Sequence, residues 1–219
     1  MSENIRLSKI IIIDYGTGNL LSVKRAFEFC GVQVKLTDDP KEITKASRLV
    51  LPGVGAYTSA MNRLKILNLI NPIKEAAQKK IPLLGICLGM QLLFDESEEF
   101  GITSGLSIIS GRVISLPTVS IDKKKLKIPY IGWSKIFYDS NEIFEKNNLI
   151  HSVSLHDAFY FVHSFMATPS QKDILSAYYL YGGHKILAAF QYENFIGCQF
   201  HPEKSGVPGL KILKNFMNL

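Results

Sequence analysis

The sequence predicts one α/β domain with a mostly parallel central sheet, flanking helices and a β-rich second half. Three observations predict this fold class. In the first half, short apolar runs alternate with segments of helical spacing, as right-handed β–α–β crossovers require. After about residue 105, strand-like runs follow one another with turns between them. The chain has 219 residues, 47% of them hydrophobic, and no internal repeat or linker, so we expect a single domain over 1–219.

The first half opens with a run of β-branched residues, KIIIID at 9–14, which predicts a strand buried on both faces. The next segment, LLSVKRAFEFC at 20–30, has apolar residues at helical spacing and stops at Gly31, a favourable helix end. Three further apolar runs predict parallel strands: VQVKL (32–36), RLVLP (48–52) and PLLGI (82–86).

Between the last two of these strands, residues 56–79 have helical spacing, and we expect the helix to break near Asn71-Pro72. The second half carries mainly strand signals. They lie at 105–117, at 159–168 and, as successive strands joined by turns, at 173–200, with a closing helix at 206–219.

The net charge of +6 comes from 25 basic and 19 acidic residues, and the densest basic run is DKKKLKIP at 122–129. A nucleic-acid-binding surface would interleave such a run with aromatic residues or set it on a known module, and neither is visible. We therefore interpret the run as a solvated loop, which could still help a protein partner to dock, and we expect no nucleic-acid partner.

Membrane and secretory classes are also disfavoured. No apolar run approaches the roughly 18 residues that a membrane-spanning helix needs. The first residues, MSENIRLSKIIIIDYG, have too short an apolar stretch and no small-residue cleavage site for a secretory signal. The three cysteines, Cys30, Cys87 and Cys198, are widely spaced and odd in number, which argues against a disulfide framework. We expect a cytoplasmic protein.

The run IPLLGICLGMQLLF at 81–94 contains two glycines where a buried strand would not favour them. G-x-C-x-G between a strand and a helix has the spacing of a nucleophile elbow, with cysteine in place of serine. Such a turn would hold Cys87 above the carboxyl edge of the sheet and at the start of a helix, where thiolate is favoured. The backbone N–H of Leu88 would then face a developing oxyanion. The alternative is a buried core cysteine beside two packing glycines.

A thiolate nucleophile needs a base, and GCQFHPEKSG offers one directly after an apolar strand. His201 and Glu203 are two residues apart at a strand end, so their side chains point the same way and the carboxylate can orient the imidazole. With Cys87 they form a triad by role: nucleophile, general acid/base and orienting group. Taken alone, HPE at a strand end is also consistent with an ordinary capped turn.

These two motifs, GICLGMQLLF and QFHPEKSG, resemble the signatures of class I glutamine amidotransferases, a family with a flavodoxin-like α/β fold. The finer resemblance is to the glutaminase subunit of imidazole glycerol phosphate synthase. It covers residues 9–217 and rests on the order and spacing of further segments: IDYGTGNLLSVKRAF, LPGVGAY, SEEFG, GLSIISGRV, IGW, FYFVHSF and the C-terminal NF.

The resemblance implies a mechanism in which Cys87 attacks the side-chain amide of L-glutamine and forms a γ-glutamyl thioester. His201 would donate a proton to the departing ammonia and then help water to hydrolyse the thioester. The PGVG loop around Gly53 and Val54 would complete an oxyanion hole with Leu88, and one such donor is typically worth about 3 kcal/mol in the transition state.

The resemblance also implies which residues hold glutamine. Gln91 follows Cys87 by four residues and so lies on the same helical face, and Glu99 would meet the α-amino group. The backbone of three consecutive residues would hold the α-carboxylate: His163, Ser164 and Phe165. The residue patterns leave alternatives, because carboxylates in a run such as DESEEF are often merely solvated and a lone histidine in FYFVHSF is typical of a satisfied core residue.

No cofactor or metal is predicted. GTGN at 16–19 lacks the third glycine of a dinucleotide fingerprint, and LPGVGAY at 51–57 lacks the Lys-Ser/Thr of a P-loop. Cys198 and His201 could form half of a metal site, but no second ligand pair is present in the sequence.

In the resembling family the partner is a cyclase subunit with a (β/α)8 barrel, and ammonia passes between the two subunits of the heterodimer without reaching solvent. Four residues would face this partner by position: Asn19, Trp133, Tyr160 and Lys204. The chain departs from the family here. Where the family usually reads PHxGWN, this sequence reads PYIGWS, with Tyr130 and Ser134 at the differing positions.

Three functional hypotheses follow. The first is the histidine-pathway glutaminase, which supplies ammonia to the cyclase subunit. The second keeps the glutaminase but pairs it with a different synthase, such as a sugar amidotransferase of surface-polysaccharide biosynthesis, and residues 130–134 motivate it. The third is a non-catalytic binding subunit that keeps the fold, and the intact Cys87, His201 and Glu203 argue against it.

Overall fold

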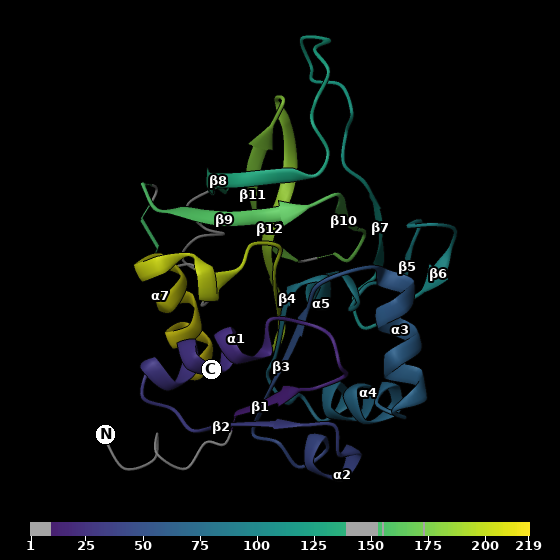
Figure 1. The fold of residues 1–219 in the computed structure, drawn as a ribbon, viewed down its shortest axis with the longest axis vertical. Coiled ribbons are helices and arrows are strands. Elements are labelled where there is room, and N and C mark those ends of the chain that lie inside the picture. Colours follow the sequence, from purple (N-terminus) through teal and green to yellow (C-terminus); the bar gives the residue numbers. More distant parts are fainter. Residues whose placement is uncertain (1–9, 139–152, 155, 173) are drawn as a thin grey trace.

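A seven-stranded sheet runs through the centre of the computed structural model, which describes residues 10–138, 153–154, 156–172 and 174–219 (Figure 1). Its strands, in order across the sheet, are β11 (Leu175–Tyr181), β12 (His184–Tyr192), β13 (Phe195–Cys198), β4 (Leu83–Cys87), β3 (Arg48–Gly53), β1 (Ile10–Ile13) and β2 (Val34–Thr37). The last five run parallel, and β12 and β11 extend the sheet with antiparallel pairing. The predicted mostly parallel central sheet is confirmed.

Helices cover both faces of this sheet. All four isoleucines of β1 are buried, and alternate ones belong to two separate hydrophobic cores, one on each face. Helices α1 (Leu20–Phe29) and α7 (Gly206–Met217) cover one face, and α3 (Tyr57–Ile66) and α4 (Ile70–Gln78) cover the other (Figure 1). A continuous β-branched run was therefore a valid signal for a strand buried on both sides.

Two smaller sheets make the second half β-rich. One has the order β10 (Phe165–Pro169), β7 (Gly111–Ser115), β5 (Glu96–Ser97) and β6 (Thr103–Ser104). The other is the antiparallel pair of β8 (Tyr130–Lys135) and β9 (Ala158–His163). Figure 1 shows this pair lying across the end of the central sheet at which β4 leads into α5 (Leu88–Gln91).

Some element boundaries differ from the predicted ones. The helical segment 56–79 divides at residues 67–69 rather than near Asn71-Pro72. Pro72 is the third residue of α4, where a missing N–H costs little because first-turn amides have no acceptor within the helix. The strand-like segment 159–168 is divided at Ser164 into β9 and β10. Of the segment 105–117, only β7 is a strand.

The short helix α2 (Pro40–Ile43) was not predicted, because four residues are too few to show a period; the side chain of Asp39 caps it. Lys9 and Asp173, the first residues of two predicted strand segments, lie outside the described residues. In the described part of the chain, no helix has both the length and the apolar character needed to cross a bilayer.

Candidate active site

Cys87 lies at the tip of a sharp turn between β4 and α5. Its φ of +53° is a left-handed conformation that strains a residue with a side chain. Close approach requires the flanking glycines: a Cβ on Gly85 would lie 2.7 Å from Met90 Cα, and one on Gly89 would lie 1.7 Å from the Leu51 carbonyl oxygen. The predicted turn is present. Because α5 has only four residues, its first N–H groups rather than a long helix dipole would act on the sulfur.

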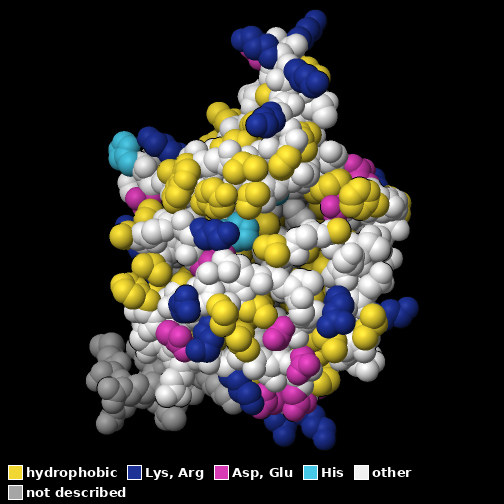
Figure 2. Space-filling view, viewed as in Figure 1, with side chains coloured by type: hydrophobic (Ala, Val, Ile, Leu, Met, Phe, Trp, Pro, Cys, Tyr) yellow, Lys and Arg dark blue, Asp and Glu magenta, His cyan; other side chains and the backbone are white. Residues whose placement is uncertain are grey.

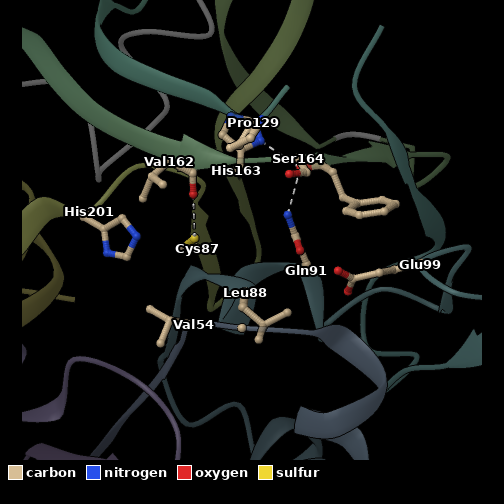
Figure 3. Close-up of a pocket in the computed structure, with 12 residues that line it drawn as sticks. Val54, Cys87, Leu88, Gln91, Glu99, Pro129, Val162, His163, Ser164 and His201 are labelled. Carbon is tan, nitrogen blue, oxygen red and sulfur yellow. Dashed lines mark hydrogen bonds between the residues drawn. The ribbon is translucent and has the colours of Figure 1, made fainter. Parts of the chain in front are cut away.

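The Cys87 sulfur is enclosed by two other segments of the chain. Gln199 Nε2 donates a hydrogen bond to Sγ at 3.6 Å. On the opposite strand pair, the carbonyl oxygen of Val162 in β9 lies 3.9 Å from Sγ (Figure 3). Cys87 is only 7% exposed and belongs to one of the two hydrophobic cores, as the alternative interpretation expected, and it also lines a cavity.

His201 and Glu203 form a buried pair in the turn that follows β13. His201 Nδ1 lies 2.9 Å from Glu203 Oε1, and the two side chains are 2% and 1% exposed. Because a carboxylate only accepts, Nδ1 donates to it and Nε2 is left for the sulfur. Burial alone would lower the pKa of His201, but Cys87 and Glu203 outweigh burial and raise this pKa to about 10. Nε2 has no hydrogen bond of ordinary geometry within the described residues, so the imidazole approaches Cys87 without a formed hydrogen bond.

A cavity of about 250 Å³ opens beside Cys87 (Figure 3). Twelve residues line it: Val54, Gly55, Cys87, Leu88, Gln91, Glu99, Pro129, Val162, His163, Ser164, Phe165 and His201. This set contains every predicted catalytic, oxyanion and substrate-binding residue except two. Glu203 lies behind His201, and Gly53 pairs with Cys87 in the β3–β4 ladder.

Gln91 faces the cavity with its amide orientation fixed. Its Nε2 donates to the Phe165 carbonyl oxygen at 2.9 Å and to Gln199 Oε1 at 2.9 Å. Both amide hydrogens are used in these bonds, so only Oε1 is left for a ligand. Gln91 can therefore accept a hydrogen bond from a bound molecule but has none to give.

Glu99 is partly exposed, but its carboxylate has a hydrogen-bond partner in the protein. Its Oε2 accepts a hydrogen bond from the backbone N–H of Tyr57 at 2.6 Å. Tyr57 is the first residue of α3, and the N-cap residue Ala56 offers no side-chain cap. From the β5–β6 turn, the carboxylate therefore caps the start of α3. The loop that carries Val54 and Gly55 leads directly into this helix.

His163 lines the cavity, but its side chain is buried and both ring nitrogens have partners within the protein. Nδ1 donates to the Phe165 carbonyl oxygen at 2.8 Å, and Nε2 accepts from the Tyr179 hydroxyl at 2.7 Å. Burial lowers the pKa of His163 to about 4, so the ring is neutral at physiological pH. Its imidazole thus fixes the bend between β9 and β10, and the satisfied-core interpretation of this side chain is confirmed.

Three of the predicted partner-facing residues lie together on the surface. The rings of Trp133 and Tyr160 pack against each other across β8 and β9, 5.8 Å apart, and Lys204 Nζ lies 5.9 Å from the centre of the Tyr160 ring. Trp133 is 57% exposed, and Figure 2 shows apolar side chains gathered across the upper part of this face. Asn19 differs, because its Nδ2 lies 3.5 Å from Glu203 Oε1 and so contacts the catalytic pair directly.

The two positions that depart from the family pattern contact each other. The Tyr130 hydroxyl and Ser134 Oγ are 2.7 Å apart. The Tyr130 ring also stacks on Tyr179, with centroids 5.3 Å apart, and meets the His163 ring edge-on. Tyr130 therefore packs inward against the histidine that shapes the cavity wall, whereas Trp133 points out.

Sequence reasoning missed Gln199, Tyr57 and Tyr179. In the sequence Gln199 stands two residues before His201 at the predicted strand end, where alternate side chains share a face, and that spacing is a signal that could have identified it. The backbone of Tyr57 and the hydroxyl of Tyr179 act through contacts 42 and 16 residues away in sequence, which no local pattern encodes.

Comparisons with known proteins bear on this site. The family model for glutamine amidotransferase class-I matches residues 11–219. The chain is 46% identical over 213 residues to the imidazole glycerol phosphate synthase subunit HisH 1 of Legionella pneumophila (strain Lens), covering 97% of this chain and 100% of that protein. It is 46% identical over 211 residues to the subunit HisH of Lactococcus lactis subsp. lactis (strain IL1403), covering 96% and 98%.

Solved structures show the same fold at low sequence identity. A crystal structure of a glutamine amidotransferase aligns with a TM-score of 0.70 at 13% identity, covering 95% of this chain and 99% of that one. The structure of PurLQS from Thermotoga maritima aligns with a TM-score of 0.65 at 17% identity, covering 96% and 97%.

Proposed function

Because this chain belongs to the class-I glutamine amidotransferase family, we propose that it is the glutaminase subunit of an imidazole glycerol phosphate synthase, acting in histidine biosynthesis. The observation that carries the proposal is the cavity in which Cys87 faces an imidazole held by Glu203. Relatives named as this subunit align with the chain over nearly their whole length, which supports this particular synthase. The family match over residues 11–219 supports a single domain over 1–219, which we expect to act in the cytoplasm.

The first half of the proposed reaction makes a thioester. Cys87 Sγ, as thiolate, attacks the side-chain amide carbon of L-glutamine, and the carbonyl oxygen becomes an oxyanion. The backbone N–H of Leu88 and those of the Gly53–Val54 loop would stabilise that oxygen. His201 Nε2, protonated, gives its proton to the amide nitrogen, the C–N bond breaks, and ammonia leaves.

The second half regenerates the enzyme. Neutral His201 takes a proton from water, the resulting hydroxide adds to the thioester, and the C–S bond breaks to release L-glutamate and the thiolate. Glu203 stays ionised and holds the imidazole through Nδ1. The raised pKa of His201 supports this assignment, because a thiolate–imidazolium pair is the starting state that the first step needs.

Recognition of glutamine would use the walls of the same cavity. We propose that the Glu99 carboxylate binds the α-ammonium group and that Gln91 Oε1 accepts a further hydrogen bond. The backbone of the bend at His163, Ser164 and Phe165 would bind the α-carboxylate. The hydrogen bonds of His163 and Gln91 to the Phe165 carbonyl oxygen hold this bend in place and support the assignment.

The proposed partner is a cyclase subunit, and we expect it to be a (β/α)8 barrel. Trp133, Tyr160 and Lys204 would contact it. Asn19 would lie at the inner edge of the interface, where its contact with Glu203 joins the partner-facing surface to the triad. Ammonia would then pass to the partner without reaching solvent.

A second candidate function keeps the glutaminase and changes the partner to another synthase, such as a sugar amidotransferase of surface-polysaccharide biosynthesis. Tyr130 and Ser134 favour it, because they stand beside Trp133 where the family usually has histidine and asparagine. The two residues also form a hydrogen bond with each other.

One experiment separates the two candidates. Glutamate release by the purified protein is measured alone, with a cyclase subunit plus its nucleotide ligand, and with the sugar-modifying synthase plus its substrate. Stimulation confined to the cyclase pairing supports the leading proposal, and stimulation confined to the other synthase selects the second. The Cys87→Ser variant should be inactive in every pairing; persistent stimulated release would contradict the triad mechanism.

A further inference from the structure

Directly behind the cavity wall, in contact with both Cys87 and Gln91, lies a polar side chain to which no role has been assigned, Gln199. It is fully buried, follows β13 directly, and donates from Nε2 to Cys87 Sγ at 3.6 Å. We propose that Gln199 is a catalytic residue that stabilises the Cys87 thiolate and holds the sulfur in place, and that Gln91 is a positioning residue that fixes the Gln199 amide. This inference rests on Cys87 as the nucleophile of the proposed function.

The hydrogen-bond chain has only one consistent direction. The Phe165 carbonyl oxygen can only accept, so the group of Gln91 that lies 2.9 Å from it is the NH2. The second hydrogen of that NH2 points to Gln199 at 2.9 Å, so Gln199 must present Oε1 there. Its own NH2 is thereby turned toward the sulfur, and the orientation of both amides follows from a single backbone carbonyl.

This geometry favours the anionic form of the sulfur. A thiolate accepts hydrogen bonds far more strongly than a thiol, so a fixed N–H donor stabilises the charged form over the neutral one. Gln199 has 0% exposure, so bulk water does not compete for its amide. Because the donor is uncharged, it keeps this effect after His201 has given up its proton and the sulfur leaves the thioester as an anion.

The first test replaces the donor by a side chain of similar length, Gln199→Met. Alkylation of Cys87 by iodoacetamide is followed against pH, with the modified cysteine identified by mass spectrometry of its peptide. We expect the midpoint of the pH profile to move up by about one unit and the rate below it to fall about tenfold. Cys30, half-buried beside α1, is an internal control whose profile should not move. Gln78→Met, on the exposed side of α4, is the matched control variant.

Two more variants keep the test decisive if Gln199→Met folds poorly. Gln199→Glu keeps the shape but replaces the donor by an acceptor, and should move the midpoint further up. Gln91→Met frees the Gln199 amide to rotate and should give a smaller upward shift. If the folded variants lose thermal stability but keep the wild-type alkylation profile, Gln199 only fills space and the inference is wrong.

Alkylation requires neither glutamine nor a partner, so this test is separate from that of the proposed function. A shifted profile in a protein that no synthase stimulates would leave the role of Gln199 standing and remove the glutaminase proposal. An unshifted profile in a protein that a synthase does stimulate would remove the role of Gln199 and leave the glutaminase proposal standing.

Discussion

Substitution of Glu99 separates the two contacts that its carboxylate would make. In the structure, Oε2 accepts the first N–H of α3, from Tyr57. In the proposed complex, the same carboxylate binds the α-ammonium group of glutamine. Glu99→Gln keeps an oxygen that can cap the helix but loses the charge, whereas Glu99→Ala loses both. We expect both variants to bind glutamine weakly and only Glu99→Ala to loosen the start of α3.

The magnitudes follow from the geometry. The oxygen–nitrogen distance is 2.6 Å and the N-cap residue Ala56 provides no side-chain cap, so Glu99→Ala should cost about 1 kcal/mol of unfolding free energy. In a chain of this size that cost lowers Tm by about 2–4 °C. A hydrogen bond to a charged partner is worth about 1.5–3 kcal/mol, so KM for glutamine should rise about 10- to 150-fold in both variants. Because the loop carrying Val54 runs directly into α3, kcat should fall in Glu99→Ala alone.

The assay combines partner-stimulated glutamate release with thermal unfolding. Glu75→Gln is the control, because Glu75 pairs with Lys79 on an exposed helix surface and should change neither readout. If Glu99→Gln melts as low as Glu99→Ala, the oxygen is not acting as a helix cap. If KM is unchanged in both variants, Glu99 does not bind the α-ammonium group.

Three further predictions concern the turn and the histidines. Gly89→Ala should yield insoluble or grossly destabilised protein, by more than about 3 kcal/mol in urea unfolding, because its Cβ would overlap the Leu51 carbonyl oxygen. The pKa of His201 is raised from 6.5 to about 10, so its stabilisation is complete below pH 6.5 and is lost as pH rises through about 10. The Tm of the wild type should therefore fall between pH 6.5 and about 10, and Glu203→Gln should make this pH dependence of Tm weaker. The pKa of His163 is lowered to about 4, so wild-type Tm should fall as pH drops from 6.5 toward 4, and His163→Gln should lose that slope.

The sequence was most informative where local pattern and packing agree. β1 and α1 begin and end within a few residues of their predicted bounds. A strand buried on both faces needs a continuous apolar run, and a helix buried on one face needs apolar residues at helical spacing, so both leave a clear pattern in the sequence. The helix break was misplaced because Pro72 is tolerated in a first helical turn, and a proline alone does not tell a first turn from an interruption.

For the site, the sequence identified residue types but not their contacts. The glycines around Cys87 predicted the turn, because neighbouring backbone lies too close to these positions for any residue with a Cβ. The orientation of Gln91, the helix cap made by Glu99 and the donor role of Gln199 depend on partners 74, 42 and 112 residues away. Such pairings arise only once the sheets are assembled.

The proposed double use of Glu99, as helix cap and as ligand of the ammonium group, would have a consequence for regulation. An ammonium group that binds this carboxylate would interact with the same negative charge that accepts the Tyr57 N–H. Binding of glutamine in the cavity would therefore be coupled to the conformation of the loop that carries Val54. Linkage is reciprocal: a docking protein that resets the loop must alter the affinity for the amino acid by the same factor by which the amino acid alters docking. Measuring either affinity with and without the other ligand would reveal that coupling.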